Sequence, residues 1–136
     1  MVEFWTDQEI LHDWMEERLG LKIDGISTFF AMSNNTGMTI CGVTNYTKYD
    51  CDVMVATTGK RAPLMMAWHH LLEYVFRVCG CKRLTSKVDA SNRRAIRMNK
   101  LGGMTLEGVM RKGNPDNGED VHVFSILKEE TKWASQ

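Results

Sequence analysis

The chain lacks several features that would assign it to a specialised class. No apolar run approaches the length of a membrane-spanning helix, and there is no internal repeat, linker or low-complexity segment. The N-terminal residues carry neither the basic nor the apolar segment of a secretory signal. With 136 residues, we expect one globular domain in the cytoplasm, with no membrane partner.

Cysteine is scarce, and its spacing does not match a zinc site. The four cysteines are Cys41, Cys51, Cys79 and Cys81. A C-x-C pair with two isolated cysteines is not a standard zinc spacing, and nothing indicates the oxidising environment that disulfides need. We therefore expect buried free thiols and no metal.

The chain has no net charge, but its charges are unevenly distributed. Residues 1–56 carry three Lys/Arg against nine Asp/Glu, residues 57–112 carry twelve against three, and residues 113–136 carry two against five. A basic middle between acidic ends favours an anionic ligand bound by the middle. The alternative is a solvated basic surface on two helices.

The apolar periodicity of the first half predicts a helix followed by strands. Thr6 and Glu9 have capping-box spacing before a helix with one apolar face, and Gly20 is suited to its C-terminal cap. Residues 26–58 alternate in the manner of three strands separated by turn residues. This half therefore predicts a helix and an antiparallel meander.

The second half predicts alternating helices and strands. The elements expected are a helix over 64–78, a strand over 83–90, a helix from Ser91 or Asn92 to Gly102, and two strands on either side of the loop 113–118. Pro63 suits the first turn of the first of these helices. The order predicts an α+β or mixed α/β domain with a largely antiparallel sheet.

Residues 57–63 lie between a strand end and a helix start. At such a junction, free backbone amides and the positive end of the helix dipole favour an anion. Lys60 and Arg61 add positive charge. The pattern is weaker than a Walker A loop, which requires more glycines and a GK[ST] ending, so an ordinary connection is the alternative.

A second motif begins at Asn92, which precedes a helix with Ala95, Ile96 and Met98 on one face and a double glycine after it. Asn92 alone would be an N-cap. Together with the segments VMVATTGKRAP, LLEYVF, KRLTSKVDA and TLEGVMR, this motif resembles the GNAT family of acetyl-CoA-dependent N-acetyltransferases. The branch of ribosomal-protein N-acetyltransferases looks closest, and the resemblance covers about residues 53–127.

The resemblance implies a fold and an activity. The expected fold is a central, mostly antiparallel twisted sheet with one splayed parallel strand pair, flanked by helices, in a single acyl-CoA-binding domain over residues 1–136. The expected reaction is direct attack of a protein or small-molecule amine on acetyl-CoA, a co-substrate. Sheet-to-sheet dimers are common in the family, so the resemblance leaves a homodimer open.

The resemblance also implies residues for the cofactor. These are Val55, Thr57, Gly59, Lys60, Arg61, Ala62, Asn92 and Arg93. The amides of the loop that starts at Gly59 would hold the CoA pyrophosphate, and Val55 would pair with the pantetheine arm near a β-bulge. Asn92 would contact the CoA arm, and Arg93 or Arg94 would reach outer phosphates.

The sequence departs from the family pattern at residues that matter for catalysis. Ala62 stands where the loop expects glycine, and Pro63 follows it. Asn99 stands where many members have a tyrosine that protonates the departing thiolate, which an amide cannot do. A second hypothesis is therefore a GNAT-fold protein without catalysis that serves as a binding or structural component, as in compact bacteriophage members associated with virions.

Candidates for catalysis are Asp52 and His122. Asp52 lies on the strand that leads to the cofactor loop, where the family can keep a carboxylate base; a solvated strand carboxylate is the alternative. His122 lies on the last strand and could line the acceptor cleft. A third hypothesis, nucleic-acid binding by the basic middle, lacks a matching motif, and we do not expect a nucleic-acid partner.

Overall fold

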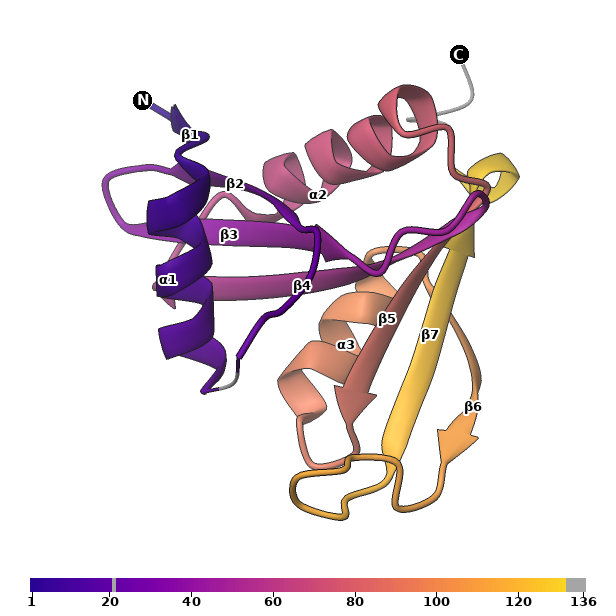
Figure 1. Ribbon diagram of the computed structural model, residues 1–136. Helices are drawn as coiled ribbons and strands as arrows, with labels where there is room; N and C mark the ends of the chain where they lie inside the picture. The colour runs from indigo at the N-terminus through magenta and orange to yellow at the C-terminus, as the bar shows by residue number, and fades with distance from the viewer. Residues whose placement is uncertain (21, 132–136) are drawn as a thin grey trace.

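The computed structural model describes residues 1–20 and 22–131 (Figure 1). Its elements are β1 (Glu3–Trp5), α1 (Gln8–Leu19), β2 (Thr28–Ser33), β3 (Gly37–Thr44), β4 (Asp50–Gly59), α2 (Leu64–Glu73), a π-helical turn (Tyr74–Val78), β5 (Arg83–Asp89), α3 (Arg93–Leu101), β6 (Thr105–Met110), β7 (Val121–Leu127) and a 3-10 turn (Lys128–Glu130). No helix among these residues is long and apolar enough to cross a membrane.

The strands form one sheet in the order β1-β2-β3-β4-β5-β7-β6. Every neighbouring pair is antiparallel except β4 and β5, which are parallel. The predicted α+β fold, with a mostly antiparallel sheet and one parallel pair, is confirmed. The sequence did not predict β1, because three residues are too few to show a period.

The parallel pair is short, and beyond it the sheet divides. β4 and β5 pair only from Asp50 with Arg83 to Asp52 with Thr85. β4 then continues along β3 to Gly59, whereas β5 continues along β7. Figure 1 shows the two strands diverging from this point. The sheet therefore consists of two halves joined at one end.

The β-bulge expected near Val55 is not present. The pairing of β3 with β4 runs from Gly37 with Gly59 to Thr44 with Asp52 without a register shift. The register shift found among the described strand pairs lies between β6 and β7. β4 and β5 thus part while β4 keeps an unbroken register with β3, and β5 keeps one with β7.

Helix α1 is capped by Asp7 and not by Thr6. The Asp7 carboxylate accepts a hydrogen bond from the Ile10 amide at 3.1 Å, and Gly20 ends the helix at a φ of 68°. The Gln8 side chain both donates to the Phe29 carbonyl and accepts from the Phe29 amide, each at 2.7 Å. It thereby continues the ladder on the edge of β2 after β1 has ended.

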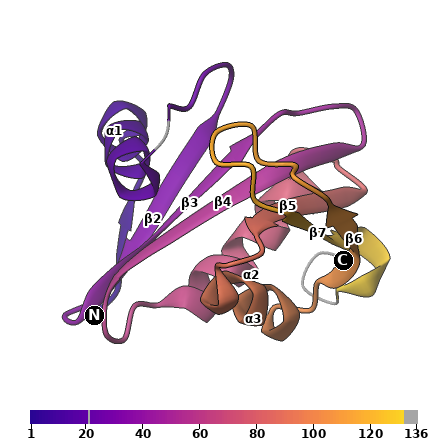
Figure 2. The ribbon, with the colours of Figure 1, turned by 90° about the horizontal axis from the view of Figure 1, so that it is seen from below.

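The helices cover opposite faces of the sheet (Figure 2). On the face of α1, the buried cluster contains Leu11, Met15, Phe29, Ala31, Ile40 and Ala56. On the face of α2, a larger cluster includes Cys51, Val53, Leu71, Phe76, Leu84 and Phe124. Successive side chains of β4 alternate between the two clusters, as the pleat of a strand requires.

The cysteines lie mainly in this second cluster. Cys41, Cys51 and Cys81 are buried, and Cys79 is half-buried. The Sγ atoms of Cys51 and Cys81 are 3.9 Å apart. Burial raises the pKa of the Cys41 thiol to about 12, so this group is a protonated, unreactive part of the core.

The outermost strand, β6, is held by a charged contact. Glu107 accepts hydrogen bonds from Arg83 of β5 and from the Ser125 hydroxyl of β7. The bonds from Arg83, and then that from Ser125, lower the pKa of the Glu107 carboxyl from 4.5 to about 2. This carboxylate therefore links all three strands of the second half of the sheet.

We expect Leu84→Ala to lower the free energy of unfolding by about 2–5 kcal/mol, because it leaves a cavity in the core. Leu106→Ala is the matched control and should cost less than about 1 kcal/mol. The Leu84 side chain is 0% exposed and the Leu106 side chain is 42% exposed. Urea unfolding at equilibrium measures both values, and equal costs would contradict the burial described here.

The low pKa of Glu107 also predicts a dependence of stability on pH. Since the folded pKa of about 2 lies below the ordinary value of 4.5, the ionised carboxylate stabilises the fold above pH 4.5. That stabilisation is lost as the pH falls towards 2. Glu107→Gln cannot titrate, so its free energy of unfolding should fall less than that of the wild type between pH 4.5 and 2. Urea unfolding at several pH values measures this difference. An equal fall in the free energy of unfolding of the two proteins between pH 4.5 and 2 would refute this role of Glu107.

Candidate functional site

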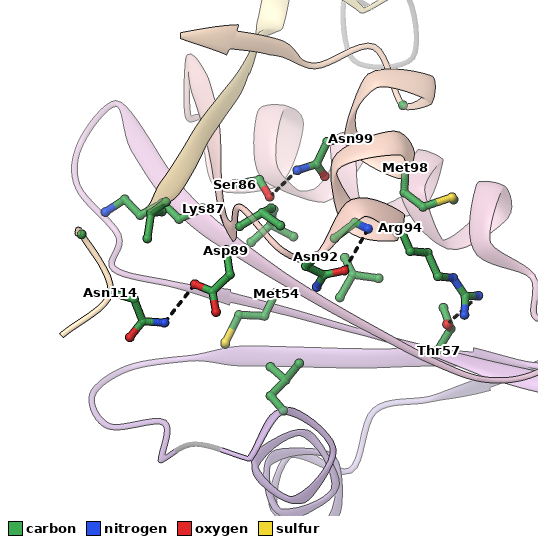
Figure 3. A pocket seen from close by; sticks show the side chains of 18 of the residues that line it. Met54, Thr57, Ser86, Lys87, Asp89, Asn92, Arg94, Met98, Asn99 and Asn114 are labelled. Atoms are coloured by element: carbon green, nitrogen blue, oxygen red, sulfur yellow. Dashed lines mark hydrogen bonds between the residues drawn. The ribbon is translucent and has the colours of Figure 1, made fainter. Parts of the chain in front are cut away.

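A cavity of about 730 Å³ opens where β4 and β5 part (Figure 3). Its walls come from both strands, from the first half of α2, from α3 and from the loop between β6 and β7. Val53 and Val55 line it from the α2 side of β4, and Met54 lines it from the α1 side. Because side chains on both faces of β4 contribute, the cleft passes between the two halves of the sheet.

The edge of β4 that faces this cleft is unpaired beyond Asp52. The Thr57 carbonyl accepts a hydrogen bond from Arg18 of α1 at 3.1 Å, so it points away from β3. Residues two apart in a strand present their backbone groups to the same edge, so Val55 directs its N–H and C=O groups into the cleft. An extended ligand could pair with these backbone groups.

One arginine of α3 reaches the same strand. Arg94 donates to the Thr57 hydroxyl at 3.4 Å and lines the cavity (Figure 3). Arg93, which the sequence favoured, does not line it. Consecutive helix residues point about 100° apart, so only one of the two can face the cleft.

The loop between β4 and α2 is braced by the turn between β2 and β3. Asn34 and Thr36 both donate side-chain hydrogen bonds to the Arg61 carbonyl, at 2.7 and 3.0 Å. Gly59 has a φ of 82°, and a Cβ atom there would lie 2.0 Å from the Thr36 carbonyl oxygen. Only glycine fits at this position. The sequence showed a turn at residues 34–37 but not its contact with the loop.

The braced loop leaves several backbone donors free. In residues 1–20 and 22–131, no hydrogen-bond partner is found for the amides of Arg61, Ala62, Met65 and Met66. No side chain caps the start of α2 either. Free amides at a helix start, with the exposed side chains of Lys60 and Arg61 beside them, are the features of an anion site.

Asn92 is the N-cap of α3, as the sequence suggested. Its side chain accepts a hydrogen bond from the Ala95 amide at 3.2 Å and so caps α3. It also lines the cavity, as do Val55 and Thr57. Gly59, Lys60, Arg61 and Ala62 lie outside the wall, in the loop at the start of α2.

Two side chains meet at the closed end of the cleft. Asn99 of α3 donates to the Ser86 hydroxyl at 3.0 Å, and both residues line the cavity (Figure 3). Ser86 is the first residue of β5 after its last pair with β4. The sequence marked Asn99 as a departure from the family pattern but gave no sign of its partner.

The opposite side of the cleft is formed by the loop between β6 and β7. The Asp89 carboxylate accepts a hydrogen bond from Asn114 at 2.9 Å (Figure 3). It also accepts one from Asn117 at 3.4 Å. Asp89, Asn114 and Asp116 line the cavity. The carboxylate of Asp89 thereby holds the loop against the end of β5.

The two predicted catalytic residues do not line the cavity. Asp52 lies where β4 and β5 are still paired, and its carboxylate contacts Asn45 at 2.8 Å and Lys87 at 3.9 Å. His122 lies opposite Val88 on the face of Phe124, whereas its neighbour Val121 lines the cavity. Val88 is on the same face of the sheet and does line the cavity, but β7 lies one strand farther from β4 than β5 does, and His122 does not line the cleft as expected.

No model of a protein family and no curated protein matches the sequence. Solved structures do match. A "putative acetyltransferase" from T. thermophilus is 27% identical with a TM-score of 0.68, over 85% of this chain and 65% of that chain. Another structure described as a "putative acetyltransferase" is also 27% identical with a TM-score of 0.67, over 85% of this chain and 62% of that chain. The chain therefore spans less than two thirds of the length of these two proteins.

Two more distant structures share the fold. The dodecameric spermidine N-acetyltransferase from Vibrio cholerae is 13% identical with a TM-score of 0.71, over 95% of each chain. An acetyltransferase of the GNAT family from Bacillus anthracis is 17% identical with a TM-score of 0.63, over 86% of this chain and 72% of that chain. With its parted parallel strands, the chain shares the fold of these acetyltransferases, one of which is described as a member of the GNAT family.

Proposed function

We propose that the chain is an acetyl-CoA-dependent N-acetyltransferase, formed by one acyl-CoA-binding domain, that acts on a protein or small-molecule amine. The observation that carries the proposal is the unpaired edge of β4 inside the cleft. A homodimer, a cytoplasmic location and a place in the ribosomal-protein branch stay predictions from the sequence.

The cleft offers complementary groups for each part of CoA. The amides of the pantetheine arm are strand-like and would pair with the N–H and C=O groups of Val55. The pyrophosphate would accept hydrogen bonds from the free amides of Arg61 and Ala62. Arg94, which lines the cavity, and the exposed Lys60 would add charge near the phosphates.

The transfer needs an open path for the acceptor. A neutral amine would attack the thioester carbon, forming a C–N bond while the C–S bond breaks and its electron pair passes to sulfur. A β4 backbone N–H directed into the cleft would polarise the carbonyl. The acceptor would enter from the α1 side, between Leu19 and the loop held by Asp89, both of which line the cavity.

Specific observations favour the alternative of a GNAT-fold protein without catalysis, acting as a binding or structural component that could be associated with a phage virion. Pro63 removes one backbone donor at the start of α2, and Asn99 holds the position of the usual tyrosine. Release of CoA from acetyl-CoA separates the two: the enzyme produces CoA slowly even without an acceptor, and the binding component does not.

Acetyl-CoA should stabilise the chain against heat. At a hundredfold excess over its dissociation constant, a ligand of the folded state adds about 2.7 kcal/mol to the free energy of unfolding. For a domain of this size that corresponds to roughly 5–15 °C in Tm. Thermal unfolding with acetyl-CoA, and with ADP as the control, measures it. No shift at millimolar acetyl-CoA would show that the fold has been kept without its co-substrate.

Arg94 and Arg93 form a matched pair for locating the phosphates. We expect Arg94→Ala to weaken CoA binding by roughly tenfold, because it removes a charged donor that lines the cavity. Arg93→Ala removes the same charge from the neighbouring residue and should weaken binding less than about threefold. Isothermal titration calorimetry with CoA compares them, and a larger loss in Arg93→Ala would restore the assignment made from the sequence.

A further inference from the structure

The closed end of the cleft contains one buried hydroxyl. Ser86 follows directly after the pair of Asp52 with Thr85, so it lies where β4 and β5 separate. It is 7% exposed, and it shares a face of β5 with Leu84 and Val88, which are both in the core beneath α2. Its hydroxyl therefore points towards the helices from the apex of the cleft.

The contact with Asn99 fixes how this hydroxyl can act. The Asn99 amide donates to the Ser86 oxygen at 3.0 Å, so the oxygen is an acceptor and its own hydrogen is available. Within the described part of the chain, no acceptor is found for that hydrogen. A hydroxyl that accepts one hydrogen bond donates another more strongly. The bond from Asn99 thus orients the Ser86 hydroxyl so that it can donate a hydrogen bond to a ligand.

Three other donor side chains in the cavity wall already have partners. The Trp68 indole donates to the Gly102 carbonyl at 2.9 Å. Arg94 donates to Thr57, and Lys87 lies 3.9 Å from the Asp52 carboxylate. Val53 and Val55, which line the cleft beside Ser86, have apolar side chains. The Ser86 hydrogen is therefore a side-chain donor available at the apex.

We propose that Ser86 donates the hydrogen bond that stabilises the thiolate leaving acetyl-CoA, and that Asn99 is the residue that positions it. The inference rests on the proposed function. As the C–N bond forms and the C–S bond breaks, the electron pair stays on sulfur and Ser86 keeps its proton while sharing it in a hydrogen bond. The proton lost by the amine leaves through the acceptor side. Stabilisation without proton transfer accounts for an asparagine where a tyrosine is usual.

The test measures the thiol pKa of bound CoA, from its thiolate absorbance as a function of pH. The complex with desulfo-CoA, which has no thiol, serves as the blank and removes the signal of the protein's own cysteines. The variants are Ser86→Ala and Asn99→Asp. In the latter, a carboxylate would accept the Ser86 hydrogen and reverse the hydrogen bond. Ser27→Ala is the control, because the Ser27 hydroxyl is buried without a partner and lies outside the cavity wall.

In the wild type, the thiol pKa of bound CoA should lie below the thiol pKa of free CoA. Ser86→Ala should raise it by about one unit, the size expected for one hydrogen bond to a charged group. Asn99→Asp should raise it further, and Ser27→Ala should leave it unchanged. CoA release from acetyl-CoA should fall about tenfold in Ser86→Ala at constant KM.

Two failures can be told apart. If Ser86→Ala and Asn99→Asp bind CoA with the thiol pKa of the wild type, the role of Ser86 is wrong and the proposed function stands. If the wild type binds no CoA, the proposed function is wrong and this inference fails with it. Should Ser86→Ala not fold, an unchanged pKa in Asn99→Asp still overturns the proposal.

Discussion

The structure depends on how little of β4 and β5 is paired. Three residue pairs, ending at Asp52 with Thr85, hold the two halves of the sheet together. Beyond them β4 remains with β3, and β5 remains with β7. This separation leaves an unpaired strand edge with which a strand-like ligand could pair. The cleft therefore lies at the centre of the sheet, where β4 and β5 are no longer paired.

The basic residues between positions 57 and 112 fall into two groups with different surroundings. Lys60, Arg61 and Arg94 gather near the start of α2 and the end of β4, where they suit an anion. Arg83 is instead bound to Glu107 and holds the outermost strand. Charge counted along the sequence favoured an anionic ligand, but it could not separate the residues near the cleft from those that pair within the sheet.

Much of the fold could be predicted from the sequence because its signals are local. Apolar periodicity located α1, α2 and strands β2 to β7 but not β1, and Asn92 caps α3 as a short polar side chain before a helix should. The contacts that were missed join distant residues: Asn34 with Arg61 across 27 positions, and Asn114 with Asp89 across 25. Asp52 and His122 were chosen by residue type and strand. Whether a residue lines the cleft depends on where β4 and β5 part, and no local sequence pattern shows that point.

The central claim is that the parted edge of β4 binds CoA, and a crystal structure of the chain with CoA tests it most directly. The account predicts the pantetheine arm paired with the backbone of Val55, the pyrophosphate on the amides of Arg61 and Ala62, and the thiol within hydrogen-bond distance of Ser86. CoA bound outside the cleft, or a cleft whose strand edge is filled only by water at saturating CoA, would contradict the account.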